Sequence, residues 1–384
     1  MQPHIIFRKF INSEGNVLKI IVVGAGVIGM LQARELALKG VEVVLLDKGR
    51  CGREASWAGG GIVSPLYPWR YSNAVTALAN WSQAYYPNLV QTLEAESDID
   101  PELTRHGLLM LDVDDKIRAL DWSKCEKSWI EEIDAEALYS LEPNLREGVT
   151  GGLWMSQVAS VRNPRLLKAL YVSLDRNPLV RVVDHAKVNS FIKKQDTLKG
   201  VVTAQGESIE ADAVILCTGA WTSVVSQSAA LDVKPVKGQM LLFSAKPGMV
   251  NRVVLSNGQY VIPRRDGSVV VGSTLEYSDF DKSTTEQARD KLSDMAINLF
   301  PVLATCQVAH HWAGLRPGTS EGIPYIGAVP ELDNLYVNAG HFRNGLVLAP
   351  ASVRLMTSIL LGEPAPVDPA PFDPRVTRES RALV

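Results

Sequence analysis

The sequence has little cysteine, no long apolar run and almost no excess of charge, and each absence excludes a class of protein. Its 384 residues include four cysteines, Cys51, Cys125, Cys217 and Cys306, which stand far apart, with no CxxC pair and no histidine at zinc-ligand spacing. Neither a disulfide framework nor a metal site is expected, and reduced thiols in a cytoplasmic protein are predicted.

Membrane and nucleic-acid partners are not indicated either. No run of 18 apolar residues occurs, so no membrane span is predicted. The 39 Lys and Arg nearly balance the 42 Asp and Glu, and no basic block points to nucleic acid. There is no internal repeat, and the only biased tract is the proline-rich stretch 363–374, expected to lie extended on the surface.

The most informative motif present is a glycine-spaced turn that follows the apolar strand predicted at 20–23. Gly24 permits the tight turn, Gly26 lets a pyrophosphate approach the backbone, and Gly29 lets helix and strand pack closely. Asp47, at the end of the next strand, can accept hydrogen bonds from a ribose diol. The series predicts a dinucleotide site, with FAD and NAD both open. Its predicted contacts are Gly24, Ala25, Gly26, Val27, Ile28, Gly29, Asp47 and Lys48.

A run rich in glycine and alanine, residues 48–61, comes next. It suits either a surface linker or a backbone that lies against a flat ligand, where any Cβ would be in the way. The second interpretation predicts cofactor contacts at Ser56, Ala58, Gly59, Gly60, Gly61 and Ile62.

Two later strands also end in small residues. The buried strand in 213–217 stops at Thr218, Gly219 and Trp221, and the strand in 334–338 turns through glycines into an apolar helix that reaches about Leu361. An additional sheet strand would explain the first equally well. If both ends face the ligand of the first motif, the ligand is long and carries a flat ring, which favours FAD.

Other elements follow from periodicity and turn chemistry. Helices are predicted at 28–39, 74–96 and 283–300 and in polar segments of 113–142, strands at 41–46, 180–192 and 200–209, and a hairpin from 259–263 and 267–274.

A flavin that oxidises a small amino acid needs a cation for the substrate carboxylate, and arginine binds both oxygens. Arg316 beside a turn, Arg343 before the last helix and Tyr260 at the hairpin are the candidates. A surface arginine, a solvated helix-end cation and an ordinary strand aromatic explain the same positions, so spacing alone does not decide.

From about Lys19 to Pro364 the chain resembles the glycine/D-amino-acid oxidase group of FAD enzymes, and within it the bacterial glycine oxidases of thiamine biosynthesis. The segments that carry the resemblance are Gly24–Gly29, Ser56–Pro65, Tyr260–Arg264, Trp312–Thr319, Pro324–Gly327 and Gly340–Pro350.

The resemblance implies that Arg316 pairs with the substrate carboxylate, that Tyr260 assists it and that Arg343 lies at the flavin and substrate pocket. Leu275 stands where related enzymes often have a methionine of the pocket wall, and no cysteine adjoins 312–319, so non-covalent FAD is expected. An assembly of several copies, such as a tetramer, is also implied. Further cofactor contacts are implied for Val188, Arg316, His341, Phe342, Arg343, Asn344, Gly345 and Leu346.

The predicted fold is α/β, with a discontinuous Rossmann-like FAD-binding domain and an α+β substrate domain built on a mainly antiparallel sheet. The FAD-binding domain is assigned 18–90, 150–228 and 314–370, the substrate domain 91–149 and 229–313, an N-terminal extension 1–17 and a C-terminal tail 371–384.

The predicted activity is oxidation of glycine, and of sarcosine or small D-amino acids, by hydride transfer to flavin N5. The imine gives glyoxylate and ammonia, O2 is reduced to H2O2, and the reaction would serve thiazole synthesis for thiamine. One alternative is a D-amino-acid dehydrogenase that reduces a quinone or another acceptor, which oxygen reactivity would discriminate. The other is a non-catalytic flavin-binding partner protein, which would not need Arg316, Tyr260 and Arg343 together.

Overall fold

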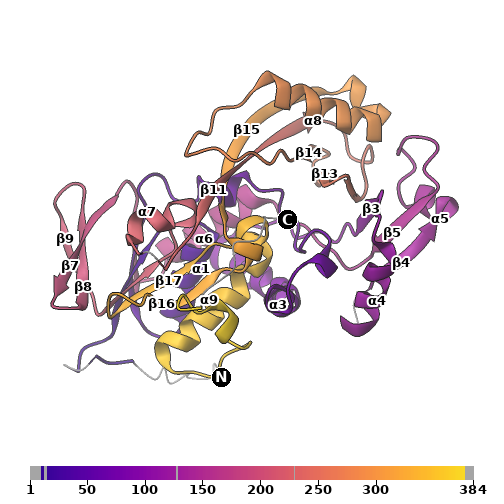
Figure 1. The fold of residues 1–384 in the computed structure, drawn as a ribbon. Coiled ribbons are helices and arrows are strands. Elements are labelled where there is room, and N and C mark those ends of the chain that lie inside the picture. The colour runs from indigo at the N-terminus through magenta and orange to yellow at the C-terminus, as the bar shows by residue number, and fades with distance from the viewer. Residues whose placement is uncertain (1–9, 13–14, 127–128, 229, 377–384) are drawn as a thin grey trace, which may run out of the picture.

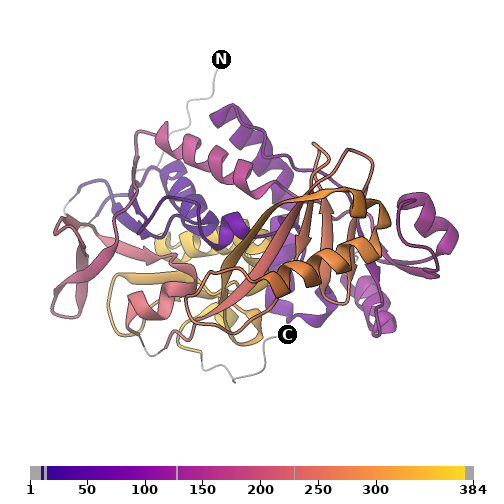
Figure 2. The same cartoon turned by 90° about the horizontal axis from the view of Figure 1, so that it is seen from above.

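The structure is a computed structural model that describes residues 10–12, 15–126, 129–228 and 230–376. Two large sheets dominate it, one of six strands and one of eight, and a small three-stranded sheet adjoins the first. In Figure 1 the helix α8 (Glu286–Leu299) covers the top of the eight-stranded sheet, and Figure 2 shows it lying across those strands from above.

The six-stranded sheet has the order β16-β17-β10-β1-β2-β6, and only β16 runs antiparallel to its neighbour. Its central strands are runs of buried Val, Ile and Leu, as expected for parallel strands covered on both faces. Its strands are β1 (Lys19–Val23), β2 (Glu42–Leu46), β6 (Val180–Val183), β10 (Ala213–Leu216), β16 (Tyr325–Ala328) and β17 (Leu335–Ala339).

Alternate residues of β1 enter different cores. Ile20 and Val22 pack in the core formed with the helices on one face, and Ile21 and Val23 face the small sheet on the other. The helices are α1 (Val27–Leu38), α3 (Asn73–Ser97), α6 (Asn163–Asp175) and α9 (Gly345–Leu361), and the small sheet comprises β7 (Val188–Lys194), β8 (Thr197–Thr203) and β9 (Ser208–Glu210).

The eight-stranded sheet has the order β15-β11-β14-β13-β12-β3-β5-β4 and is antiparallel except where β12 pairs with β3. One face packs on α8 through Leu292, Ala296 and Leu299. The strands are β3 (Leu108–Leu111), β4 (Glu131–Asp134), β5 (Gly151–Met155), β11 (Lys234–Ser244), β12 (Val253–Ser256), β13 (Gln259–Pro263), β14 (Val269–Gly272) and β15 (Gln307–Gly318). The short helices α4 (Lys116–Glu126) and α5 (Ala135–Leu141) flank its β4 edge.

The predicted α/β fold with a second, mainly antiparallel sheet is confirmed, and so are the helices at 74–96 and 283–300 and the hairpin. The prediction of helix alone for 113–142 is wrong, because β4 pairs with β5 between two helices. The domain boundaries stay a prediction; β5, placed in the predicted segment 150–228, pairs within the eight-stranded sheet.

The two chain ends contact the body more than predicted. Asn12 in the N-terminal extension donates its amide to the Asp212 carboxylate at 3.0 Å. The proline-rich stretch does not simply lie extended, because a 3-10 turn at Ala370–Phe372 buries Phe372, which is 1% exposed. The parts of both predicted end segments at 1–9, 13–14 and 377–384 lie outside the described residues.

The last helix is the most apolar one. Among the described residues, the helical stretch Phe342–Leu361 is long and apolar enough to cross a membrane, but 67% of it is buried inside the protein. Pro350 lies within this helix and has no N–H to offer. The Tyr86 hydroxyl donates to the Leu346 carbonyl at 2.6 Å, so the acceptor four residues before the proline is satisfied by another helix.

Candidate active site

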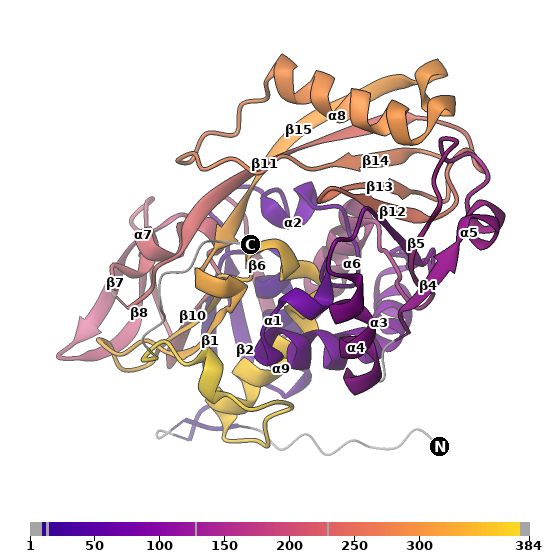
Figure 3. The same ribbon diagram turned by 45° about the vertical axis from the view of Figure 1, so that its right-hand side comes forward.

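A cavity of about 490 Å³ runs between the two large sheets. One end is formed by the glycine turn after β1 and the other by β11, β13, β15 and the start of α9. Figure 3 shows the short helix α2 (Ala55–Ala58) between the strands of the lower and the upper sheet. The three glycine-rich segments thus meet at one cavity.

Most of the predicted residues line this cavity. They are Gly24, Gly26, Val27, Ile28, Asp47, Lys48, Ser56, Ala58, Gly59, Gly60, Gly61, Ile62, Val188, Thr218, Gly219, Trp221, Tyr260, Arg316, His341, Phe342, Arg343, Gly345 and Leu346. Four others, Ala25, Gly29, Asn344 and Leu275, are not among its lining residues. Leu275 is 40% exposed, so the structure does not place it in the pocket wall.

The glycine turn is required first by packing within the protein. At Gly24, where φ is +98°, a Cβ would lie 2.5 Å from the Cys217 carbonyl oxygen. A Cβ at Gly29 would lie 1.8 Å from the Gly24 carbonyl oxygen, whereas one at Gly26 would meet only Ser56 Oγ, at 3.0 Å. Gly26 is therefore the glycine of the turn that leaves room on the cavity side.

Polar groups fix this end of the cavity. The Asp47 carboxylate accepts hydrogen bonds from the backbone N–H of Ala25 at 2.8 Å and of Gly49 at 2.9 Å. Burial raises the pKa of Asp47, and these two bonds oppose the rise. Ser56 Oγ accepts from Val27 N at 2.9 Å, which leaves the serine O–H to donate to a ligand.

At the opposite end, Arg316 projects from β15 over Gly238 of β11. Its guanidinium donates to the carbonyl oxygens of Lys237 and Thr274, both at 3.3 Å, and to Ser273 Oγ at 2.6 Å. All three acceptors are neutral, and no carboxylate lies within ion-pair distance of Arg316 in the described part of the chain. Burial lowers the pKa of Arg316, and the Tyr260 hydroxyl partly offsets this.

The start of α9 brings His341 and Arg343 to the cavity. His341 is 1% exposed, and burial lowers its pKa to about 3, so the imidazole is neutral; its Nε2 lies 3.1 Å from Ser352 Oγ. Arg343 is half-buried, and its side chain has no hydrogen bond or ion pair with any residue that the structure describes. It also lines a second cavity of about 550 Å³, together with Tyr67 and Arg70.

Several lining residues were not predicted from the sequence. They include Glu54, Ser64, Leu66, Asn163, Lys187, Gly238, Met240 and Gly314. Gly238 and Gly314 face each other across β11 and β15, and this register is set by a pairing of distant segments. No local signal in the sequence would have found them.

The residues present fit an elongated flavin dinucleotide. A helix N-terminus and an acidic residue lie at one end, a glycine-rich wall runs along the cavity, and two cations lie at the other end. A Cβ at Gly219 would meet no atom within 4 Å, so this strand end opens onto free space. Within the described chain, Cys217 is the cysteine that lines the cavity. Burial raises the pKa of its thiol, which disfavours the thiolate that would be needed to form a covalent bond to the cofactor.

The fold and the cavity define a flavin-dependent oxidoreductase. The chain belongs to the DAO family of FAD dependent oxidoreductases, whose model matches residues 19–359, and FAD is its cofactor. It is 50% identical to the glycine oxidase of Pseudomonas aeruginosa over 93% of this chain and 98% of that protein, and 48% identical to that of Pseudomonas putida over the same shares. The crystal structure of glycine oxidase from Geobacillus kaustophilus matches with a TM-score of 0.87 at 26% identity, over 94% of this chain and all of that one.

Proposed function

We propose that this chain oxidises glycine, and also sarcosine and small D-amino acids, to the imine, which water converts to glyoxylate and ammonia in the case of glycine. The observation that carries the proposal is Arg316, a half-buried side chain at the cavity whose described hydrogen-bond partners are all neutral. A cation withdrawn from water without an anion is costly, and a substrate carboxylate would supply the anion. The similarity to glycine oxidases supports the same substrate class.

The residues of the chain divide the work between the two ends of the cavity. The glycine turn, Asp47 and Ser56 would hold the ADP part, and Gly59 to Ile62 would lie along the flavin. FAD, when bound, supplies the hydride acceptor at flavin N5. The positive end of the helix dipole at α9 would stabilise the negative charge that reduction places on the flavin.

Arg316 and Tyr260 would fix the substrate so that its α-carbon faces the flavin at about 3–3.5 Å. No side-chain base is needed if the amine binds in its neutral form, and His341 is buried against Ser352. The Tyr260 hydroxyl donates to Met240 Sδ at 3.3 Å, and both side chains line the cavity together with Arg316. This wall favours substrates with a small group on the α-carbon.

Bound FAD would pass the two electrons taken from the substrate to O2, which would leave as H2O2. The chain is also similar to the bifunctional protein ThiO/ThiG of Synechocystis, at 30% identity over 90% of this chain and 52% of that protein. This similarity supports a role in making the thiazole of thiamine. A cytoplasmic location and a homo-oligomer such as a tetramer belong to the proposal as well, and light scattering of the purified protein tests the oligomer.

The test measures O2 uptake and H2O2 release with glycine for wild type, Arg316→Met and Arg316→Lys. Loss of a charge-assisted bidentate contact should raise KM about tenfold to a hundredfold in Arg316→Met, with a smaller rise in Arg316→Lys. Exposed Arg176, which pairs with Asp98, supplies the control variant Arg176→Gln. Flavin bleaching by glycine under anaerobic conditions without O2 uptake would favour a dehydrogenase, and no bleaching by any amino acid would leave only a flavin-binding protein.

A further inference from the structure

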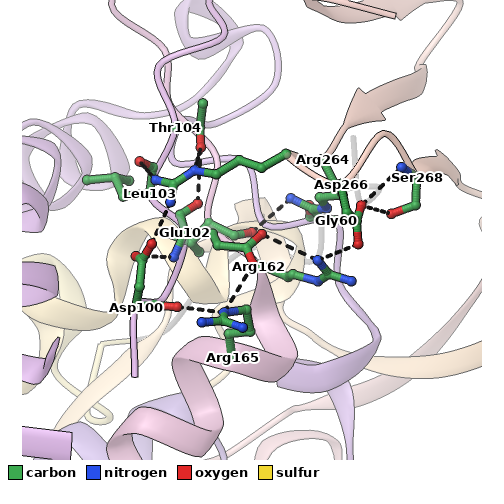
Figure 4. Close-up of polar contacts among 12 residues, drawn as sticks. Gly60, Asp100, Glu102, Leu103, Thr104, Arg162, Arg165, Arg264, Asp266 and Ser268 are labelled. Carbon is green, nitrogen blue, oxygen red and sulfur yellow. Dashed lines mark hydrogen bonds and ion pairs between the residues drawn. The ribbon is translucent and has the colours of Figure 1, made fainter. Parts of the chain in front are cut away.

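The strand β13 is followed by an arginine whose side chain is almost completely removed from solvent. Arg264 is 9% exposed and donates from Nη2 to the Gly60 carbonyl at 2.7 Å and from Nη1 to the Val161 carbonyl at 3.0 Å. Figure 4 shows its guanidinium directed at Gly60. Gly60 belongs to the glycine-rich wall of the cavity, whereas Arg264 itself does not line the cavity.

Two residues of β13 and the residue that follows this strand contact Gly60. Tyr260, Ile262 and Arg264 are two residues apart, so their side chains share one face of the extended chain. A Cβ at Gly60 would lie 2.8 Å from Ile262 Cδ1 and 3.0 Å from Tyr260 Cε2, so both side chains occupy the side of Gly60 on which a Cβ would stand. The strand β13, which brings Tyr260 to the cavity, therefore also packs against the backbone at Gly60 in the glycine-rich wall of the cavity.

Among the residues that the structure describes, no carboxylate lies within ion-pair distance of Arg264. Burial lowers the pKa of Arg264 to about 10, although the guanidinium remains charged at neutral pH. The two carboxylates that favour its charge electrostatically, Glu102 and Asp266, are bound instead by Arg162, at 3.4 and 2.8 Å. Figure 4 shows these ion pairs of Arg162 beside Arg264, whose N–H groups donate to the two carbonyl oxygens.

The second acceptor of Arg264, the Val161 carbonyl, belongs to a segment that is itself hydrogen-bonded to the glycine-rich wall. Val161 N donates to the Gly61 carbonyl at 2.9 Å, so the segments at 60–61 and 161 are already paired. Arg264 bridges both segments from the side of the eight-stranded sheet. Without its donors, two buried carbonyl oxygens would lose their partner, and the wall would be free to shift away from β13.

We propose that Arg264 is a positioning residue that holds the Gly60 backbone, and with it the flavin, in register with Tyr260. Hydride transfer depends steeply on the placement of donor and acceptor, and a displacement of about 1 Å can cost about a hundredfold in rate. The part of the proposal that concerns the substrate rests on the proposed function, whereas the part that concerns FAD does not.

The test compares Arg264→Met and Arg264→Lys with Arg265→Gln. Arg265 is the neighbouring residue on the same turn, its side chain is 46% exposed and it bonds Thr104 and the Leu103 carbonyl, so it controls for a charge lost from this region. The dissociation constant of FAD is measured by flavin fluorescence, and the visible flavin spectrum, kcat and KM for glycine are measured on the FAD-saturated enzyme.

Arg264→Met should weaken FAD binding about tenfold or more and lower kcat about a hundredfold with little change in KM, while the flavin absorption band shifts. Arg264→Lys keeps the charge but replaces the fork by one ammonium, so it should lie between Met and wild type, and it decides the matter if Arg264→Met does not fold. Arg265→Gln should behave as wild type. The proposal is overturned if both Arg264 variants match Arg265→Gln in FAD affinity, spectrum and kcat, or if only KM rises. Failure of wild type to oxidise glycine would refute the proposed function alone, because the FAD affinities and spectra still decide the role of Arg264.

Discussion

A single methyl group on Gly238 should displace the proposed carboxylate clamp without removing it. A Cβ at this position would lie 2.2 Å from both Nη1 and Nη2 of Arg316, and the backbone conformation of Gly238 is open to alanine. The clashing atoms are the far end of a flexible side chain, so the guanidinium moves and the strand stays in place. Ordinary contact begins near 3.4 Å, and the guanidinium must therefore shift by about 1 Å.

Such a shift breaks the bonds of Arg316 to Lys237, Ser273 and Thr274 and misplaces the carboxylate by a similar distance. We expect kcat/KM for glycine to fall about a hundredfold in Gly238→Ala, which corresponds to about 2.7 kcal/mol of transition-state stabilisation. FAD binding and the melting temperature should change little, because neither the glycine turn nor a buried backbone contact is touched.

The assay is steady-state O2 uptake over a range of glycine concentrations, together with FAD titration and thermal unfolding. Ser244→Ala, at an exposed position of the same strand β11, is the control. If Gly238→Ala keeps the kcat/KM of wild type, the position of Arg316 does not govern substrate binding. If kcat/KM falls only because FAD is lost, the reasoning from the clash with Arg316 is refuted as well.

Two further predictions concern stability. Tyr86→Phe removes the hydroxyl that satisfies Leu346 beside Pro350 and should lower the free energy of unfolding by about 1–3 kcal/mol in urea titrations, whereas exposed Tyr277→Phe should not; equal values for the two variants would contradict this. The pKa of His341 is lowered by burial to about 3, below its unfolded value of about 6.5, so the unfolded chain takes up a proton first and stability falls as pH drops from about 6.5 towards 3. Between pH 7 and pH 5 this amounts to about 2 kcal/mol in urea unfolding, and His341→Gln should flatten the dependence on pH.

Local patterns were enough to predict the elements that carry the glycine turns. Each of these elements is formed by contiguous residues: β1, the turn at Gly24 and α1 follow one another, and so do the strands β13 and β14 of the hairpin. Neighbouring residues therefore determine their conformation. The convergence of the turns at Gly24, Gly219 and Gly340 on one cavity could also be inferred, because each of these turns follows an apolar strand.

Contacts between distant segments could not be predicted. The position of Arg316 over Gly238 depends on the register between β11 and β15. The hydrogen bond from Arg264 to Gly60 joins residues 204 positions apart. Leu275, assigned to the pocket wall by similarity to related enzymes, is 40% exposed and is not among the residues that line the cavity, and no pattern in neighbouring residues indicates this exposure. β4 was missed because it has four residues and none of them is buried, which leaves no apolar alternation to read.

Two arginines beside the eight-stranded sheet, Arg264 and Arg316, show why only one of them was found from the sequence. Both lose hydration, and both donate only to neutral oxygens in the contacts described. Arg264 is closed off from the cavity, and Glu102 and Asp266 compensate its charge from behind Arg162. Arg316 lines the cavity, so its missing anion can come from outside the protein. Removing a guanidinium from water costs free energy that an anion can offset. For Arg264 the protein supplies the compensating carboxylates, which fits an arginine that positions the cavity wall. For Arg316 a bound substrate would supply the anion, which fits an arginine that binds a ligand.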